Sequence, residues 1–257
     1  MRENIIHFNS VCALYKLTRP GYPMELYRAI SDKIDSTLNG RFLEIGAGTG
    51  VSSKEIYSVF GKKMLLLEPS LESCNILKET FKYNNDIEII NCLFEDFRTT
   101  EKFDAIFAPS SFHWLEDTCK YKLVSELLKK GGFLIIYCNY YSLADKLILG
   151  EISSINQIYG NLSTFNVESQ QKQIHKQMED INRSNFQIIE SQVYKNIKRY
   201  TIKDFTSFLK TFVKIKNKSK DYIQAIIDIV GRNYDYVDVE ILTCLFITKR
   251  SIGDITN

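Results

Sequence analysis

Three alternating glycines mark the segment of this 257-residue chain that is best suited to ligand chemistry. They lie in Leu43-Glu44-Ile45-Gly46-Ala47-Gly48-Thr49-Gly50, between an apolar run and a helix-length segment. Glycine lets the backbone turn sharply and lets a ligand approach it, and the free N–H groups at a helix start face that ligand. A dinucleotide loop GxGxxG would need glycine at position 51, where Val51 stands, and no Lys-Ser/Thr pair follows for a P-loop.

An acidic residue follows the next apolar run. Glu68 comes eighteen residues after Gly50, at the carboxyl end of the run Met64 to Leu67. In open parallel sheets an acid at this point accepts hydrogen bonds from ribose hydroxyls. The two features together indicate a site for a nucleoside-containing ligand.

Three further residues could act on a second ligand. His113 could serve as a general base or as an orienting donor, and its other interpretation is a capping or packing residue beside Trp114. Trp114 has two interpretations, as a residue that lines the site or as an aromatic residue of the core or a lid. Arg19 could pair with a ligand carboxylate or could lie on the surface. His7 and His175 have no partners at metal-ligand spacing, so we expect both on the surface and no metal site.

The elements that must position these residues alternate along the chain. Short apolar runs at 42–45, 64–67, 87–92, 103–107 and 133–137 are separated by helix-length segments at 52–60, 71–83 and 116–130. Strand, helix and strand at this spacing predict right-handed crossovers and a parallel sheet covered on both faces. We expect Lys129, Lys130 and the two following glycines to close the third helix. Later segments predict helices at 143–159, 168–181 and 201–230, and strands at 185–193 and 236–249.

This pattern, without a linker rich in Gly, Pro or Ser, predicts one domain over residues 1–257. Its sheet would use about 36–140 together with 185–193 and 236–249, and residues 1–35 and 141–235 would form a helical lid. Tyr137 is expected in the core, whereas Tyr140 would line a pocket after strand five. Phe205, Phe208 and Phe212 have helical spacing and favour core packing.

Composition limits the protein class. With 44% hydrophobic and 25% charged residues, and no apolar run of membrane-spanning length or secretory signal, we expect a soluble, cytoplasmic protein. The six cysteines are scattered and predict reduced thiols, mostly buried. The lysine-rich stretch from Lys195 to Lys220 favours a solvated helix face over a nucleic-acid surface.

The ExGxGxG loop, Glu68 and the segment Leu127-Leu128-Lys129-Lys130-Gly131-Gly132 resemble the class I S-adenosylmethionine (SAM)-dependent methyltransferase family, with Lys130 where proline is usual. The resemblance implies a Rossmann-like, doubly wound α/β fold with seven strands, one of them antiparallel near Val237 to Lys249. It also implies that the loop holds SAM or its product S-adenosylhomocysteine, without a metal. The implied cofactor residues are Glu44, Gly46, Ala47, Gly48, Gly50, Glu68, Pro69, Glu95, Asp96, Phe97, Ala108 and Arg19, with Asp96 favoured over Glu95 at the adenine.

A narrower resemblance is to the small-molecule branch that includes trans-aconitate methyltransferase. It rests on Tyr15, on Arg19-Pro20-Gly21-Tyr22-Pro23, on Phe112-His113-Trp114 and on Tyr200-Thr201, and it departs at Phe212-Val213. It implies acceptor contacts from Tyr15, Tyr22, Trp114 and Tyr140, with His113 as base or orienting group.

We therefore expect a methyltransferase acting on a small organic molecule, at a carboxylate or hydroxyl oxygen. It would be a monomer or weak homodimer, with no membrane partner. The alternatives are a nucleic-acid methyltransferase using residues 195–220, which the loop Ala108-Pro109-Ser110-Ser111 does not favour, and a SAM-binding regulator without turnover.

Overall fold

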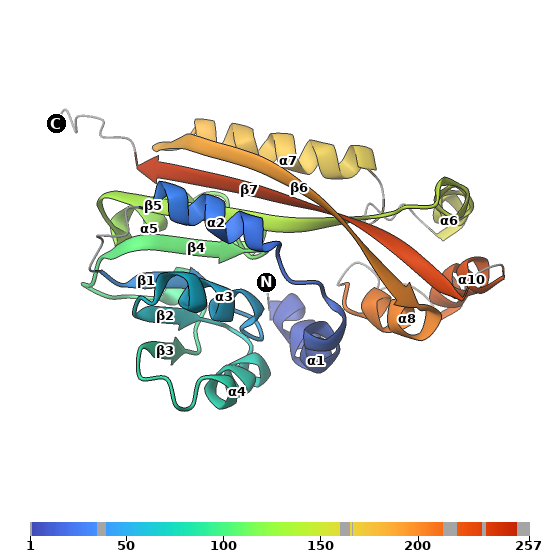
Figure 1. Cartoon of the computed structure of the whole chain (residues 1–257), viewed down its shortest axis with the longest axis horizontal. Coiled ribbons are helices and arrows are strands. Elements are labelled where there is room, and N and C mark those ends of the chain that lie inside the picture. The colour runs from blue at the N-terminus through green and yellow to red at the C-terminus, as the bar shows by residue number, and fades with distance from the viewer. Residues whose placement is uncertain are drawn as a thin grey trace.

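A seven-stranded sheet forms the centre of the molecule, in the order β3-β2-β1-β4-β5-β7-β6 (Figure 1). A computed structural model describes residues 2–34, 40–159, 165, 167–212, 220–232 and 235–250. The strands are β1 (Phe42–Ile45), β2 (Met64–Leu67), β3 (Ile87–Ile90), β4 (Phe103–Pro109), β5 (Leu128–Leu143), β6 (Phe186–Thr201) and β7 (Tyr236–Arg250). Strand β7 runs antiparallel to both of its neighbours, and the pairings from β3 to β5 are parallel. The expected α/β fold with one antiparallel strand is confirmed.

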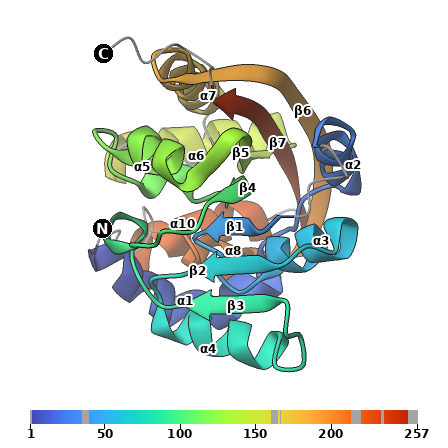
Figure 2. The same cartoon turned by 90° about the vertical axis from the view of Figure 1, so that its left-hand side faces the viewer.

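Strands β1, β2 and β4 are buried along their whole length, and helices cover both faces of the sheet (Figure 2). Helices α2 (Met24–Lys33) and α3 (Val51–Phe60) pack on one face, together with Leu77 of α4 (Leu71–Thr80). Helices α5 (Lys120–Leu127) and α7 (Val167–Asn182) pack on the other, where Val124 and Ile181 are buried.

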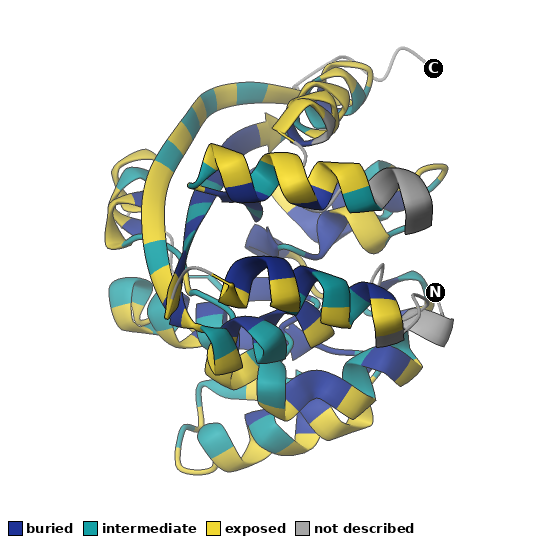
Figure 3. Cartoon of the chain, turned by 90° about the vertical axis from the view of Figure 1, so that its right-hand side faces the viewer, coloured by how far each residue is buried: buried dark blue, intermediate teal, exposed yellow. Residues whose placement is uncertain are grey.

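A second apolar cluster lies beyond the central sheet. The ends of β5, β6 and β7 extend past the shorter strands and pack against α6 (Lys146–Tyr159), α8 (Ile202–Lys210) and α10 (Lys220–Gly231) (Figure 1). Phe205 and Phe208 are fully buried there, so their expected core role is confirmed. Strand β6 is the edge strand beside β7, and Figure 3 shows mostly exposed and intermediate residues along its arch.

The sheet takes more of the chain than the pattern predicted. Helix α5 ends at Leu127 rather than at Lys130, because Leu128 already pairs with Phe103 on β4 and the Lys129 ammonium lies 2.9 Å from Asp104. Strand β6 continues to Thr201, so Lys195 and Arg199 lie on a strand and not on a helix face. Each forms a cross-strand ion pair, with Glu240 at 2.5 Å and with Asp238 at 2.8 Å. The expected helix over 201–230 is observed as α8 and α10, and Lys214, Lys216 and Lys218 lie outside the described residues.

Helix α1 (Arg2–Thr18) accounts for another difference. His7 was expected on the surface but is buried, because α1 packs against α8 and α4 and one of its faces is covered. His175 is exposed as expected. The thiols are free; those of Cys12, Cys74 and Cys244 are buried, and those of Cys92, Cys119 and Cys138 are partly exposed.

Candidate active site

The glycine loop is a tight turn between β1 and α3. Gly46, Gly48 and Gly50 all have positive φ, which residues with a Cβ rarely adopt. The N–H groups of Gly46 and Ala47 donate to Leu67 O at 2.8 and 3.1 Å, which holds the loop beside the end of β2. A Cβ built on Gly48 would meet no protein atom within 4 Å, so this face of the loop is open to a ligand.

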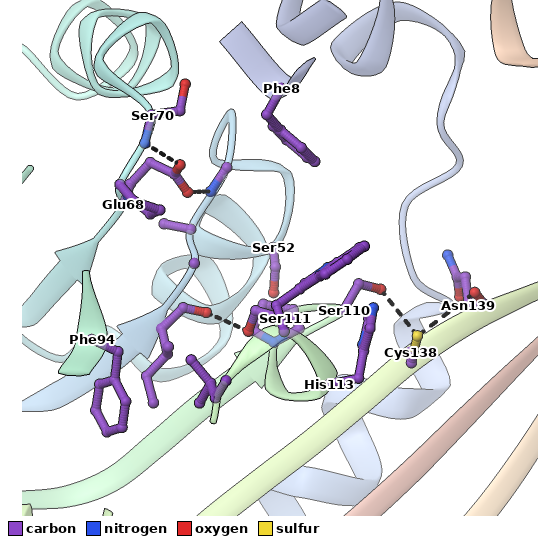
Figure 4. A pocket seen from close by; sticks show the side chains of 18 of the residues that line it. Phe8, Ser52, Glu68, Ser70, Phe94, Ser110, Ser111, His113, Cys138 and Asn139 are labelled. Atoms are coloured by element: carbon purple, nitrogen blue, oxygen red, sulfur yellow. Dashed lines mark hydrogen bonds between the residues drawn. The ribbon is translucent and has the colours of Figure 1, made fainter. Parts of the chain in front are cut away.

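Glu68 connects the loop to the next helix. Its Oε2 accepts from Gly48 N at 2.7 Å and its Oε1 accepts from Ser70 N at 2.8 Å, as Figure 4 shows. Burial raises the pKa of this carboxyl, and the two backbone donors oppose the rise because they favour the ionised form. Ser70 in turn caps α4 by accepting from Ser73 N. Glu68 therefore organises the turn that carries it as well as facing the cavity.

A cavity of about 560 Å³ opens at the carboxyl ends of the parallel strands. Twelve of the seventeen expected site residues line it: Tyr15, Arg19, Tyr22, Gly46, Ala47, Gly48, Glu68, Pro69, Glu95, His113, Trp114 and Tyr140. Pockets of this size hold drug-sized ligands. The structure thus gathers residues from six separate parts of the chain around one space.

Five expected residues do not line this cavity. Gly50 faces the side chains of Leu77 and Phe81, and Ala108 is buried within β4. In the short helix η1 (Phe94–Asp96), Asp96 is exposed while Glu95 lines the cavity. Glu95 Oε2 is buried and has no hydrogen-bond partner among the described residues, so at this point of the chain the structure brings Glu95 rather than the favoured Asp96 to the cavity. The other two are Phe97, which packs into the core, and Glu44, which is fully buried behind the loop.

The end of β4 bends sharply into the cavity. Ser110 has φ of 48°, a left-handed conformation that costs about 1 kcal/mol or more in a residue with a Cβ. Its hydroxyl accepts from the Tyr22 hydroxyl at 2.8 Å. It donates to Cys138 Sγ at 3.6 Å, as Figure 4 shows. These contacts join the N-terminal segment, β4 and β5 at one point.

His113 and Trp114 follow on the short helix η2 (Phe112–Trp114). Both are exposed side chains that line the cavity, and their ring centres are 4.9 Å apart. Neither belongs to the core, whereas the contact between the two rings fits both a role in the site and packing of His113 beside Trp114. They form an accessible wall near the cavity mouth.

Arg19 is held in an aromatic box. Its Nε donates to Thr211 Oγ1 at 2.8 Å, and its guanidinium carbon lies 3.7 Å from the ring centre of Phe212 and about 5 Å from those of Tyr15 and Tyr141. Arg19 is therefore not a free surface arginine. Its guanidinium brings a positive charge to the cavity wall.

Sequence reasoning missed the contribution of α7 and of the α5 start. Gln170, Gln173 and Gln177 line the cavity from one face of α7, and the Gln177 amide donates to the Tyr121 hydroxyl at 2.9 Å. Their spacing of three and four residues on an otherwise polar helix was the available signal. The Lys120 side chain is 3% exposed, and its Nζ lies 2.5 Å from Asp117 Oδ1. Nothing in the sequence besides its charge indicated that Lys120 lines the cavity.

Among the described residues, no cluster of His, Cys, Asp and Glu could hold a metal ion. No helix in the same part of the chain is long and apolar enough to cross a membrane.

Comparisons with known proteins agree with this geometry. Residues 42–132 match a family model described as a methyltransferase domain. Along 260 aligned residues the chain is 24% identical to an uncharacterized methyltransferase of Schizosaccharomyces pombe, covering 95% of this chain and 96% of that protein. It is 27% identical over 115 residues to a malonyl-[acyl-carrier protein] O-methyltransferase of Ilyobacter polytropus, covering 42% of this chain and 43% of that protein.

A solved structure shares the fold. It is a phosphoethanolamine N-methyltransferase of Haemonchus contortus in complex with phosphomonomethylethanolamine and S-adenosylhomocysteine. The TM-score is 0.52 at 16% identity, and the alignment covers 95% of this chain and 57% of that chain. The family model spans the loop, Glu68 and the β4 end, which are three of the segments that build the cavity. The matched methyltransferase-domain model, the methyltransferase relative and the shared fold together support a class I S-adenosylmethionine-dependent methyltransferase.

Proposed function

We propose that the protein transfers the methyl group of SAM to an oxygen of a small organic molecule, a carboxylate or a hydroxyl, bound beside the cofactor in the same cavity. The observation that carries the proposal is the continuity of that cavity. One wall is the glycine loop with Glu68, and the other contains His113, Trp114 and Tyr140. A volume of about 560 Å³ with an aromatic wall suits a cofactor together with a small acceptor.

The residues of the first wall fit the cofactor. In this proposal the open face of Gly48 lies against it, Glu68 accepts from its ribose hydroxyls and Glu95 accepts from its adenine. Arg19, fixed by Thr211 and Phe212, would pair with its carboxylate. When bound, SAM supplies a methyl group already activated by the sulfonium charge.

The protein then has mainly to position the acceptor and to exclude water. Reacting atoms held about 3 to 3.5 Å apart can account for a large part of the rate. Desolvation raises the pKa of Tyr15 to about 12 and that of Tyr22 well above its ordinary value, so both hydroxyls stay protonated. The Tyr15 hydroxyl can therefore donate a hydrogen bond to an acceptor oxygen, whereas the Tyr22 hydroxyl donates to Ser110. The partial likeness to an O-methyltransferase supports an oxygen acceptor.

Methyl-labelled SAM tests this function directly. The protein is incubated with the label and a cell extract that is then separated into small molecules, nucleic acid and protein. We expect label in the small-molecule fraction. Label in nucleic acid would favour use of the basic segment, and no transfer despite SAM binding would indicate a regulator without turnover.

His113 gives a prediction that separates the two acceptor classes. For a hydroxyl acceptor, His113→Gln should lower turnover by about two orders of magnitude, because a base must take the proton, and should remove an acidic limb from the pH–rate profile. For a carboxylate, already ionised, the loss should be smaller and mainly in acceptor affinity. Native turnover with native acceptor affinity would remove His113 from the site.

The N-terminal segment gives a second prediction. Tyr15, Arg19 and Tyr22 line the cavity, while Asn139 on β5 donates to Pro20 O and Gly21 O at 3.3 and 3.2 Å. Cofactor binding should order this segment further, so amide hydrogen exchange over residues 15–22 should slow when SAM is added. Unchanged exchange there, with protection at the glycine loop, would place the segment outside the cofactor site.

A further inference from the structure

Glu44 is an acidic residue buried where no positive charge compensates it. It lies on β1, two residues before Gly46, and its side chain is 0% exposed. Neither carboxyl oxygen of Glu44 has a hydrogen-bond partner among the described residues. Glu44 also takes part in none of the ion pairs that these residues form. An ionised carboxylate in such a place is costly, because it loses its hydration and no cation compensates its charge. The neutral acid is the form that this environment favours.

The groups that face Glu44 are all neutral or acidic. Ser53 of α3 is its neighbour and slightly favours the anion, whereas Glu68 at the end of β2 disfavours it. Tyr27 of α2 and Tyr137 of β5 are the other titratable neighbours, and both have a pKa raised by burial. Together with desolvation, the largest effect, these surroundings raise the pKa of Glu44 to about 8.

Glu44 is nevertheless next to the cofactor wall. It is separated from Gly46 by Ile45 alone, and it interacts electrostatically with Glu68, whose carboxylate holds Gly48. A positive charge in the cavity would act on Glu44 through protein interior rather than through water, so screening would be weak. SAM carries such a charge on its sulfonium, and S-adenosylhomocysteine does not.

We propose that Glu44 is protonated in the cofactor-free protein and ionises when SAM binds, so that its buried carboxylate favours SAM over S-adenosylhomocysteine. The inference rests on the cofactor site proposed above. The carboxyl O–H bond breaks, the proton passes to the solvent buffer, and the negative charge stays on Glu44. After methyl transfer the sulfonium charge is gone, so Glu44 takes a proton back and the product loses this attraction.

The linkage between SAM binding and proton release by Glu44 determines how SAM affinity changes with pH. A bound cation lowers the pKa of Glu44 below about 8, so SAM affinity rises with pH between the lowered value and about 8, and is constant above it. Each unit of lowering corresponds to about tenfold in affinity. Glu68 faces the ribose that both ligands share, so its ionisation cancels in the ratio of SAM to S-adenosylhomocysteine affinity.

Calorimetry of both ligands from about pH 6.5 to about pH 9 tests the proposal. In the unchanged protein the affinity ratio should rise about tenfold. Runs in two buffers of different ionisation enthalpy should show proton release with SAM and none with S-adenosylhomocysteine. In Glu44→Gln, which keeps the side-chain shape, the ratio should stay flat while S-adenosylhomocysteine affinity is retained. Glu72→Gln, an exposed change on α4, should behave like the unchanged protein.

Three results would overturn the proposal. A flat ratio in the unchanged protein, or equal proton release with both ligands, contradicts it without any variant that might misfold. If the ratio of SAM to S-adenosylhomocysteine affinity still rises with pH in Glu44→Gln but not in His113→Gln, the pH dependence belongs to the His113 imidazole in the cavity. If neither ligand binds the unchanged protein, the cofactor site itself fails, and Glu44 with it.

Discussion

Gly48→Val should lower SAM affinity by at least about 100-fold, or about 2.7 kcal/mol, while leaving the protein folded. The reason is geometric. A Cβ at Gly48 meets no protein atom within 4 Å, so the added side chain fills ligand space rather than the core. Gly46 and Gly50 are unsuitable for this test, because a Cβ there would lie 2.7 Å from Ser111 and 2.8 Å from Leu77. Calorimetric titration with SAM and a thermal unfolding curve measure the two effects separately.

Gly61→Val is the matched control for that variant. Gly61 has φ of 56°, close to the 58° of Gly48, and a Cβ there also meets nothing within 4 Å, but it ends α3 away from the cavity. Both variants should lose a similar stability of about 1 to 2 kcal/mol from the left-handed backbone. Equal loss of SAM affinity in the two would mean that backbone strain, and not contact with the cofactor, explains the Gly48 result.

Glu68→Ala should weaken SAM and S-adenosylhomocysteine alike, by about tenfold to 100-fold, which corresponds to about 1.5 to 3 kcal/mol. Two losses add. The ribose would lose its acceptor, and the Gly48 and Ser70 N–H groups would lose the carboxylate that holds them at 2.7 and 2.8 Å. Titration with each ligand in turn measures the change.

Glu72→Ala, four residues later on the exposed first turn of α4, controls for the loss of an acidic side chain near the site. Its affinity for both ligands should stay within about twofold of the unchanged protein. If Glu68→Ala also kept native affinity, another residue would have to hold the ribose, and Glu95 would be the first to examine.

The central sheet was predictable because its signals are local. Each short apolar run is bounded by turn residues and followed by a helix-length segment, so the βαβ units follow from periodicity. The antiparallel position of β7 came from the family resemblance and not from the pattern. The extension of β5 and β6 was not predictable in this way, because it depends on pairing with β7, whose paired residues lie 35 or more positions farther along the chain. Lys195 and Arg199 find their acidic partners only through that pairing.

The site residues, too, were predictable where their signal is local and not where it depends on tertiary contacts. Loop residues and Glu68 were found because their function depends on chain neighbours, such as a turn before a helix and an acid after a strand. Which of Glu95 and Asp96 faces the cavity depends on the rotation of the three-residue helix η1, which residue type does not determine. The burial of His7 and the polar face of α7 depend on how helices dock, and so does the aromatic box around Arg19. Such contacts are tertiary and have no sequence period of their own.

A crystal structure of the protein with S-adenosylhomocysteine tests the account most directly. We expect the ligand along the open face of Gly48, with its ribose hydroxyls within about 3 Å of the Glu68 carboxylate and its own carboxylate on Arg19. The space between the ligand sulfur and the wall of His113 and Tyr140 should remain free for an acceptor. A ligand bound elsewhere, or in this cavity with its ribose away from Glu68, would contradict the account.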